Sequence, residues 1–168
     1  IRTSMDNLKI SKQQRKVCNR FVREIGGQVR VSKKAEPFRL ELVVEAQRDQ
    51  KEQRFYTRFE KSEFSDEKFQ LYKKYQTRVH GDDPGDVTQK GFDSFLCSSP
   101  FNPGENDEKE LKQLNEWVNN YQSGCKKNDV GPKIRLGPTH ECYYLDGELI
   151  AISVLDFLPT GVSSIYFI

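Results

Sequence analysis

The sequence predicts an α/β (α+β) fold, in which a β-sheet is flanked by helices. The last thirty of the 168 residues contain the densest apolar runs, and they divide into three strand patterns separated by short breakers. Residues 69–80 instead repeat aromatic and apolar side chains at three- and four-residue steps, which is typical of a helix. Both kinds of pattern occur in a chain long enough for one domain.

Charge is distributed unevenly along the chain, although the net charge is only +2. Residues 9–34 carry many lysines and arginines and few acids, whereas residues 102–116 are rich in acids. A basic N-terminal arm can contact phosphate groups, and a solvated helix face explains the same charges without a ligand.

The four cysteines, Cys18, Cys97, Cys125 and Cys142, form no C-x-x-C pair and have no metal-ligand spacing. We therefore predict reduced thiols, a reducing compartment and no metal site. The sequence has no signal-peptide pattern and no apolar run of membrane-spanning length. Because the chain begins with Ile1 and ends within a strand pattern, we expect it to be part of a longer protein.

A helix is predicted over residues 12–25. Ser11 is placed to cap its first turn, and a pair of glycines follows its last residue. Val17, Phe21 and Ile25 fall on one face and are expected to be buried.

Two strands are predicted before the central helix. Residues 38–46 alternate apolar and polar side chains, which indicates a half-exposed strand, and residues 55–59 indicate another. We place a basic helical segment at residues 1–36, leading into a core at residues 37–168. A polar insertion at residues 102–133 is expected to pack on the edge of that core.

The helix over residues 69–80 is the element around which we organise the chain. Ser65 is its predicted N-cap, and Gly81 is its predicted C-terminal stop. An amphipathic helix with tyrosines at the rim of the core explains the pattern, but polar groups within an apolar stripe also make it a candidate site. The predicted stripe consists of Phe69, Tyr72, Gln76 and Val79.

A loop over residues 81–86 and a short helix within residues 91–100 follow. We expect Phe92, Phe95 and Leu96 to share the buried side of that helix.

The three C-terminal strand patterns contain the strongest turn signal of the chain, Asp146-Gly147, which predicts a tight hairpin. The middle strand, over residues 149–158, is apolar on both faces and is therefore expected in the interior of a covered sheet. Asp156 interrupts it, and a buried acid is costly unless it is paired or functional. A strand-end acid that caps the following turn is the alternative.

The chain contains, in order, the blocks LYKKYQTRVHGD, GFDSFLCSSP, HECYYLDGELIAISVLDFLP and GVSSIYF. Over roughly residues 65–168 these blocks strongly resemble the arginyl-tRNA–protein transferases of the eukaryotic N-degron pathway. The resemblance implies a GNAT-like, mixed and largely antiparallel sheet, incomplete at the C-terminus. The family's iron–sulfur cluster belongs to a cysteine-rich N-terminal region, so no cofactor is expected in this segment.

The implied reaction is aminoacyl transfer. The α-amine of a protein beginning with Asp, Glu or oxidised Cys attacks the ester carbonyl of arginyl-tRNA, and the ribose hydroxyl leaves. The ester is already activated, so the site must position the reactants, deprotonate the amine, stabilise the oxyanion and recognise two charged side chains.

The resemblance also implies which residues form the site. Asp156 would bind the arginyl guanidinium or α-ammonium, and Gln76 with the tyrosine hydroxyls would orient the amine or the ester oxygen. The predicted catalytic residues are Asp156, His80, Tyr75 and Gln76. The predicted substrate-binding residues are Tyr72, Arg78, Lys73, Lys74, Ser98, Ser99, Ser163 and Tyr166.

Each candidate has an ordinary structural explanation as well. His80 can be a favourable charge at a helix end, the serines can cap a turn, and exposed lysines are usually solvated. His140, at the start of a strand, has only a weak claim.

Two other functions remain open. One is a module that binds tRNA or N-degron peptides without chemistry, and the other is a coenzyme-A-dependent N-acetyltransferase. The transferase is expected in the cytoplasm, with the nucleus as a second compartment, and without a membrane partner. We expect residues 1–168 alone to be inactive.

Overall fold

The computed structural model describes residues 10–26, 41–98, 137–158 and 161–168. The chain forms two compact units, Ile1–Arg54 and Phe55–Ile168, which we describe separately. The predicted boundary between residues 36 and 37 and the predicted insertion at residues 102–133 lie outside the described residues.

The first unit contains α1 (Lys12–Glu24) and α2 (Glu41–Arg48). The predicted cap of α1 is confirmed, and it is a capping box. The Gln14 amide donates to Ser11 Oγ at 3.2 Å, and the Ser11 amide donates to Gln14 Oε1 at 2.8 Å. The helix ends before Gly26, whose φ of +80° is the left-handed conformation that glycine adopts without strain.

The buried face of α1 differs from the predicted one. Cys18, Phe21 and Val22 pack against α2, whereas Val17 is 61% exposed. The prediction was right for Phe21 and Ile25 and wrong for Val17. Several apolar stripes can be drawn on this helix, and contact with α2 determines which one is buried.

The predicted strand over residues 38–46 is wrong where the structure describes it, because α2 is a helix from Glu41. Its apolar residues Leu42, Val43 and Ala46 also fit helical spacing. Packing against α1 buries Ala46 completely, which favours the helix over the alternating strand pattern.

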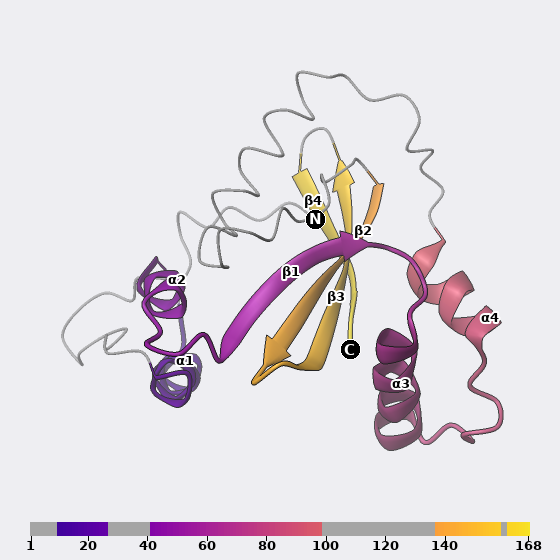
Figure 1. Cartoon of the computed structure of the whole chain (residues 1–168), viewed down its shortest axis with the longest axis horizontal. Coiled ribbons are helices and arrows are strands. Elements are labelled where there is room, and N and C mark those ends of the chain that lie inside the picture. Colours follow the sequence, from indigo (N-terminus) through magenta and orange to yellow (C-terminus); the bar gives the residue numbers. More distant parts are fainter. Residues whose placement is uncertain (1–9, 27–40, 99–136, 159–160) are drawn as a thin grey trace. The chain divides into compact units, whose positions relative to one another are not determined.

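The second unit is built on a four-stranded sheet whose strands are antiparallel in the order β1-β2-β3-β4 (Figure 1). This confirms the predicted fold class, the strand at residues 55–59 and the three C-terminal strands. Asp146 and Gly147 have φ values of +53° and +86°, so the predicted tight hairpin is confirmed as well. The strands are β1 (Phe55–Lys61), β2 (Gly137–Leu145), β3 (Glu148–Leu158) and β4 (Gly161–Phe167).

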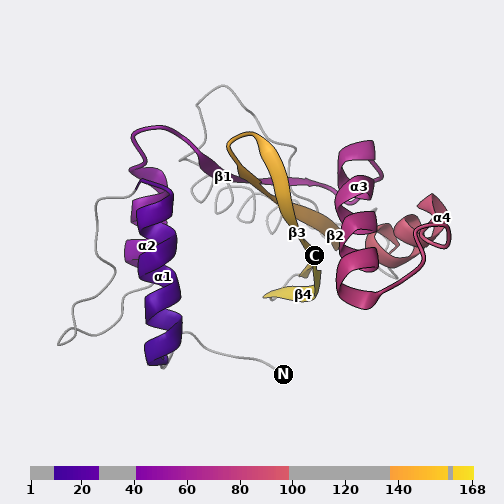
Figure 2. The same cartoon turned by 90° about the horizontal axis from the view of Figure 1, so that it is seen from below.

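One face of this sheet packs against helices that lie side by side in both views (Figures 1 and 2). The core between them is formed by Phe92 and Leu96 from the helices and by Cys142 and Ile152 from the strands, all at most 1% exposed. The helical segments are α3 (Asp66–Tyr75), continued by the π-helical turn η2 (Gln76–His80), and α4 (Gln89–Phe92), continued by the π-helical turn η3 (Asp93–Cys97).

The two π-helical turns change which side chains are buried. Val79 in η2 is 61% exposed and Phe95 in η3 is 50% exposed, although both were predicted on buried faces. A π-turn closes i→i+5 hydrogen bonds instead of i→i+4. The three- and four-residue spacing on which the prediction depended is therefore lost at these turns.

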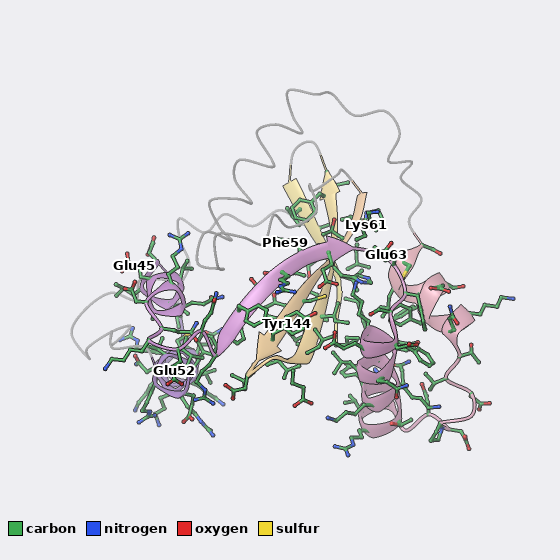
Figure 3. All side chains as sticks on the ribbon, viewed as in Figure 1. Glu45, Glu52, Phe59, Lys61, Glu63 and Tyr144 are labelled. Atoms are coloured by element: carbon green, nitrogen blue, oxygen red, sulfur yellow. The ribbon has the colours of Figure 1, made fainter. Side chains whose placement is uncertain are left out.

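The start of α3 is attached to the sheet by an ion pair in which Lys68 is buried and Glu60 is partly exposed. Lys68 Nζ lies 2.9 Å from Glu60 Oε2 and donates to the Lys61 carbonyl at 3.2 Å. The Tyr144 hydroxyl donates to the second oxygen of Glu60 at 3.2 Å. Burial, and next the charge of Glu60, raise the pKa of Tyr144, so its phenol stays protonated. Figure 3 draws the side chains around this pair, with Tyr144 labelled.

Candidate functional site

The site begins at the C-terminal end of α3, where the helix widens into η2. The Thr77 hydroxyl lies 2.9 Å from the Lys73 carbonyl and 3.2 Å from the Lys74 carbonyl, so it donates back to the preceding turn of the helix. Gly81 then ends the helix with a φ of +79°. Such π-turns occur frequently at functional sites.

Four aromatic side chains, one each from α3, η2, η3 and β4, meet beside this turn. His80 Nε2 lies 3.1 Å from the Tyr166 hydroxyl on β4. The Tyr75 ring makes edge contacts with the rings of His80 at 5.2 Å and of Tyr166 at 6.1 Å. Phe95, from η3, makes an edge contact with the Tyr166 ring, with the ring centres 4.9 Å apart. We call these four residues the aromatic cluster.

A register shift in the pairing of β3 with β4 determines which side chains of β4 face the site. Tyr166 pairs with Val154, and Ser163 pairs with Asp156, so all four side chains lie on the face that packs against α3. Residues three apart in a regular strand point to opposite faces. The register shift between Val154 and Leu155 accommodates an extra residue in β4 and places Ser163 and Tyr166 on the same face.

Asp156 is buried within β3, between β2 and β4. It lies two residues from Val154, which is the partner of Tyr166. The Asp156 side chain is therefore on the same sheet face as Tyr166. A site that contains both Asp156 and the aromatic cluster requires this placement.

The hydroxyls of Tyr72 and Tyr166 remain protonated. Partial burial, and next a hydrogen bond with Tyr75, raise the pKa of Tyr166 above its ordinary value. Burial and the charge of Asp82 also raise the pKa of Tyr72, and a hydrogen bond with Gln76 opposes the rise. A protonated phenol can donate a hydrogen bond to a carbonyl or oxyanion, and can accept one from an amine.

Other predicted site residues are placed less centrally. Lys74 and Arg78 are exposed and Lys73 is half-buried on the same helix end. Ser98 ends η3, where its hydroxyl donates to the Asp93 carbonyl at 3.1 Å, which is the turn-capping alternative. Ser99 lies outside the residues that the structure describes.

His140 has a structural explanation. Its Nε2 lies 3.0 Å from the Leu96 carbonyl, which can only accept a hydrogen bond, so this nitrogen carries the proton. Ser62 Oγ lies 3.1 Å from the same nitrogen and donates to the same carbonyl at 2.8 Å. Burial lowers the pKa of His140 to about 4, although the bond to Leu96 opposes this. A neutral His140 therefore joins β2 to the end of η3.

The sequence did not predict two residues of this region, Asp82 beside the cluster and Phe95 within it. Asp82 was assigned only to a loop, yet its carboxylate accepts a hydrogen bond from Gln76 Nε2 at 3.2 Å. Its position directly after the glycine that ends the helix was the available signal. Phe95 was predicted as core, and no sequence signal indicated the π-turn that exposes it.

The thiols of Cys97 and Cys142 are poor candidates for chemistry. Burial, and next the charge of Asp93, raise the pKa of Cys97 to about 11. Burial, and next the charge of Glu60, raise the pKa of Cys142 to about 12. Both stay protonated at neutral pH and are weak nucleophiles.

No three histidine, cysteine, aspartate or glutamate side chains gather to hold a metal ion within the ranges that the structure describes. Over the same ranges, every helix is too short or too polar to cross a membrane.

The four-stranded antiparallel sheet with helices on one face is consistent with a GNAT-like fold, and this is the class of domain that the structure indicates. Residues 67–168 match the family described as "Arginine-tRNA-protein transferase, C terminus". The chain belongs to this family.

Three relatives illustrate the similarity. The whole chain is 38% identical to arginyl-tRNA–protein transferase 1 of Saccharomyces cerevisiae and spans 32% of its length. Transferase 1 of Arabidopsis thaliana is 35% identical over 63% of the chain and 14% of its own length. Transferase 1 of Drosophila melanogaster is 35% identical over 59% of the chain and 16% of its own length. The chain therefore spans a third or less of each of these relatives.

Proposed function

We propose that this chain forms part of an aminoacyltransferase, which moves arginine from arginyl-tRNA to the N-terminal α-amine of proteins beginning with Asp, Glu or oxidised Cys. Membership of the transferase family supports the reaction. The observation that supports the location of the site is the aromatic cluster, where His80 and Tyr166 bring two proton-carrying groups to one point.

In the proposed reaction the amine nitrogen attacks the ester carbonyl carbon and a C–N bond forms. The tetrahedral oxyanion then collapses, and the bond from carbon to the ribose oxygen breaks. The amine loses a proton and the ribose oxygen gains one, so protons are conserved. His80 is placed to receive the proton, and the phenols of Tyr75 and Tyr166 are placed to donate hydrogen bonds to the oxyanion.

Asp156 is our candidate for a cationic group of the donor, with Ser163 beside it on β4. A buried carboxylate binds a cation more strongly than an exposed one, because competing water is excluded. Gln76 is the candidate for orienting the amine, since its Oε1 is buried and has no hydrogen-bond partner among the described residues.

The acceptor carries a negative side chain, and the tRNA carries phosphates. The end of the helix that contributes His80 carries three basic side chains, Lys73, Lys74 and Arg78. Of these, Lys74 and Arg78 are exposed. We assign these three side chains to the acceptor's acid or to the tRNA backbone.

We place the reaction in a reducing compartment, the cytoplasm first and the nucleus second. Cys18, Cys97 and Cys142 are free thiols in the structure, which is compatible with this assignment. No step of the proposed reaction uses a cofactor held by this chain.

The test uses the complete gene product that carries this chain. Transfer of labelled arginine from arginyl-tRNA to a peptide beginning with Asp is measured for the wild type, for Asp156→Asn and for Asp86→Asn, an acid in an exposed loop. Thermal unfolding checks that each variant is folded. We expect the wild type and Asp86→Asn to transfer arginine and Asp156→Asn to lose most of the activity.

Other outcomes separate the alternatives. Equal transfer by folded Asp156→Asn makes that acid structural. Binding of arginyl-tRNA without transfer by the folded wild type favours the binding module. Inhibition by coenzyme A together with acetyl transfer favours an acetyltransferase.

A further inference from the structure

Phe95 is an exposed aromatic side chain on a backbone that is fixed on both sides. Its ring is 50% exposed, whereas Phe92 and Leu96 in the same helical segment are at most 1% exposed. The Leu96 carbonyl accepts hydrogen bonds from Ser62 Oγ at 2.8 Å and from His140 Nε2 at 3.0 Å. The turn that carries Phe95 is therefore anchored to the sheet, while the ring itself stays open to solvent.

The π-helical turn η3 keeps this ring outside the core. The Ser98 amide and hydroxyl both donate to the Asp93 carbonyl, at 3.0 Å and 3.1 Å, and the amide bond closes the i→i+5 ring of the turn. A phenylalanine ring left in water loses the stabilisation that burial would supply. Because π-helical turns are rare and occur often at functional sites, we interpret the exposed ring as a binding group.

Phe95 contacts the candidate site directly. Its ring centre lies 4.9 Å from that of Tyr166, and the two planes cross at 77°. The Tyr166 hydroxyl lies 3.1 Å from His80 Nε2, and the proposed reaction places the ester carbonyl beside this pair. A single tyrosine side chain therefore separates Phe95 from the proposed position of the reacting atoms.

The donor carries a base next to its ester. In arginyl-tRNA the ester oxygen belongs to the ribose of the terminal adenosine, so the adenine lies within one nucleoside of the carbonyl. The end of a tRNA is single-stranded, and unpaired bases stack on aromatic side chains. Every donor tRNA ends in the same base, whereas the acceptor proteins share only their first residue. A ring held in one place suits the constant partner.

We propose that the ring of Phe95 stacks on the terminal adenine of arginyl-tRNA and so positions the ester beside His80 and Tyr166. This proposal rests on the proposed function and adds a base-binding residue to its site. Stacking requires a flat ring and not apolar character alone. Tryptophan can therefore replace Phe95, and leucine cannot.

The experiment measures stacking without transfer. The probe is uncharged tRNA whose terminal adenine is replaced by 2-aminopurine, a fluorescent base whose emission falls when it stacks on an aromatic ring. The complete gene product is titrated into the probe, and thermal unfolding checks that each variant is folded. We expect the wild type and Phe95→Trp to quench the probe. Phe95→Leu should bind it about 5- to 100-fold more weakly and without quenching at saturation.

Phe167→Leu is the matched control, because it makes the same change at an equally exposed ring. Phe167 is 56% exposed, and its ring contacts that of Tyr143 at 5.6 Å. It follows Tyr166 in β4, so its side chain points to the opposite face of the sheet. We expect this variant to quench and bind the probe as the wild type does. Loss of quenching in both leucine variants, in neither, or in Phe95→Trp overturns the proposal.

Transfer of arginine separates this proposal from the proposed function. Phe95→Leu should lower kcat/KM for arginyl-tRNA by about 5- to 100-fold and leave KM for the acceptor peptide unchanged. A change confined to the KM of the peptide would assign Phe95 to the acceptor and overturn the proposal. Normal transfer by a wild type that does not quench rejects the stacking alone. Quenching that requires Phe95 without any transfer of arginine rejects the proposed function and leaves the base-binding residue in place.

Discussion

His80 Nε2 lies 3.1 Å from the hydroxyl of Tyr166, a residue 86 positions further along the chain. The pair joins the end of α3 to β4, and Tyr75 contacts both rings. The imidazole nitrogen therefore pairs with a phenol of another element, which simple capping of its own helix would not require.

If His80 and Tyr166 act as one unit in proton transfer, their substitutions should not add. We expect His80→Ala to lower kcat by about 100-fold and Tyr166→Phe, which keeps the ring, by about tenfold. The double variant should be no worse than His80→Ala, which initial transfer rates will show. Val79→Ala, a neighbouring exposed position, is the control. Strictly additive losses would contradict the paired role.

Gly81 should be required for its backbone conformation and not for space. A Cβ at Gly81 would meet nothing within 4 Å, but its φ is +79°. We expect Gly81→Ala to cost about 1 kcal/mol and to lower transfer, because His80 and Asp82 flank this turn. Gly81→Asn should keep more of both, since asparagine tolerates this conformation. Thermal unfolding and transfer rates measure the two effects, and equal behaviour of both variants would argue against a conformational cause.

Breaking the pair of Lys68 and Glu60 should destabilise the second unit. Lys68 is 4% exposed and Glu60 is 28% exposed, so Lys68→Met leaves a carboxylate with little water. We expect a loss of about 3 kcal/mol in the free energy of unfolding. The double variant Lys68→Met/Glu60→Gln should lose less, and exposed Lys74→Met should lose almost nothing. Denaturant titration of the complete gene product measures all three, and a double variant worse than Lys68→Met would refute the pair.

His140 should make the fold sensitive to acid. Its pKa falls from 6.5 to about 4 on burial, so below pH 6.5 the unfolded chain takes up a proton that the folded chain does not. Stability should therefore fall as the pH drops from 7 to 4, by about 3 kcal/mol in total. We expect the Tm of the wild type to fall more steeply over this range than that of His140→Gln. Parallel curves would show that His140 is not responsible.

Elements defined by local signals were predicted well. Ser11 and Ser65 cap the helices predicted for them, and Asp146-Gly147 forms its hairpin. These signals act through backbone conformation and hydrogen bonds within a few residues, so they can be read directly from sequence.

Elements whose conformation depends on contacts with other parts of the chain were predicted less well. Residues 41–46 satisfied a strand pattern and a helix pattern, and contact with α1 selected the helix. At Val79 and Phe95 the π-turns moved the side chains out of the predicted faces. Neither the contact between α1 and α2 nor the position of a π-turn can be predicted from the periodicity of apolar residues.

The sequence by itself determined the family, the three C-terminal strands and the tight hairpin at Asp146-Gly147. Only the tertiary structure decided that Tyr166 lies against His80 and that His140 joins β2 to η3. The physical reason is distance along the chain. These contacts depend on the register shift in β4, on the π-turns and on helices packed against the sheet, and each is set by long-range burial rather than by neighbouring residues.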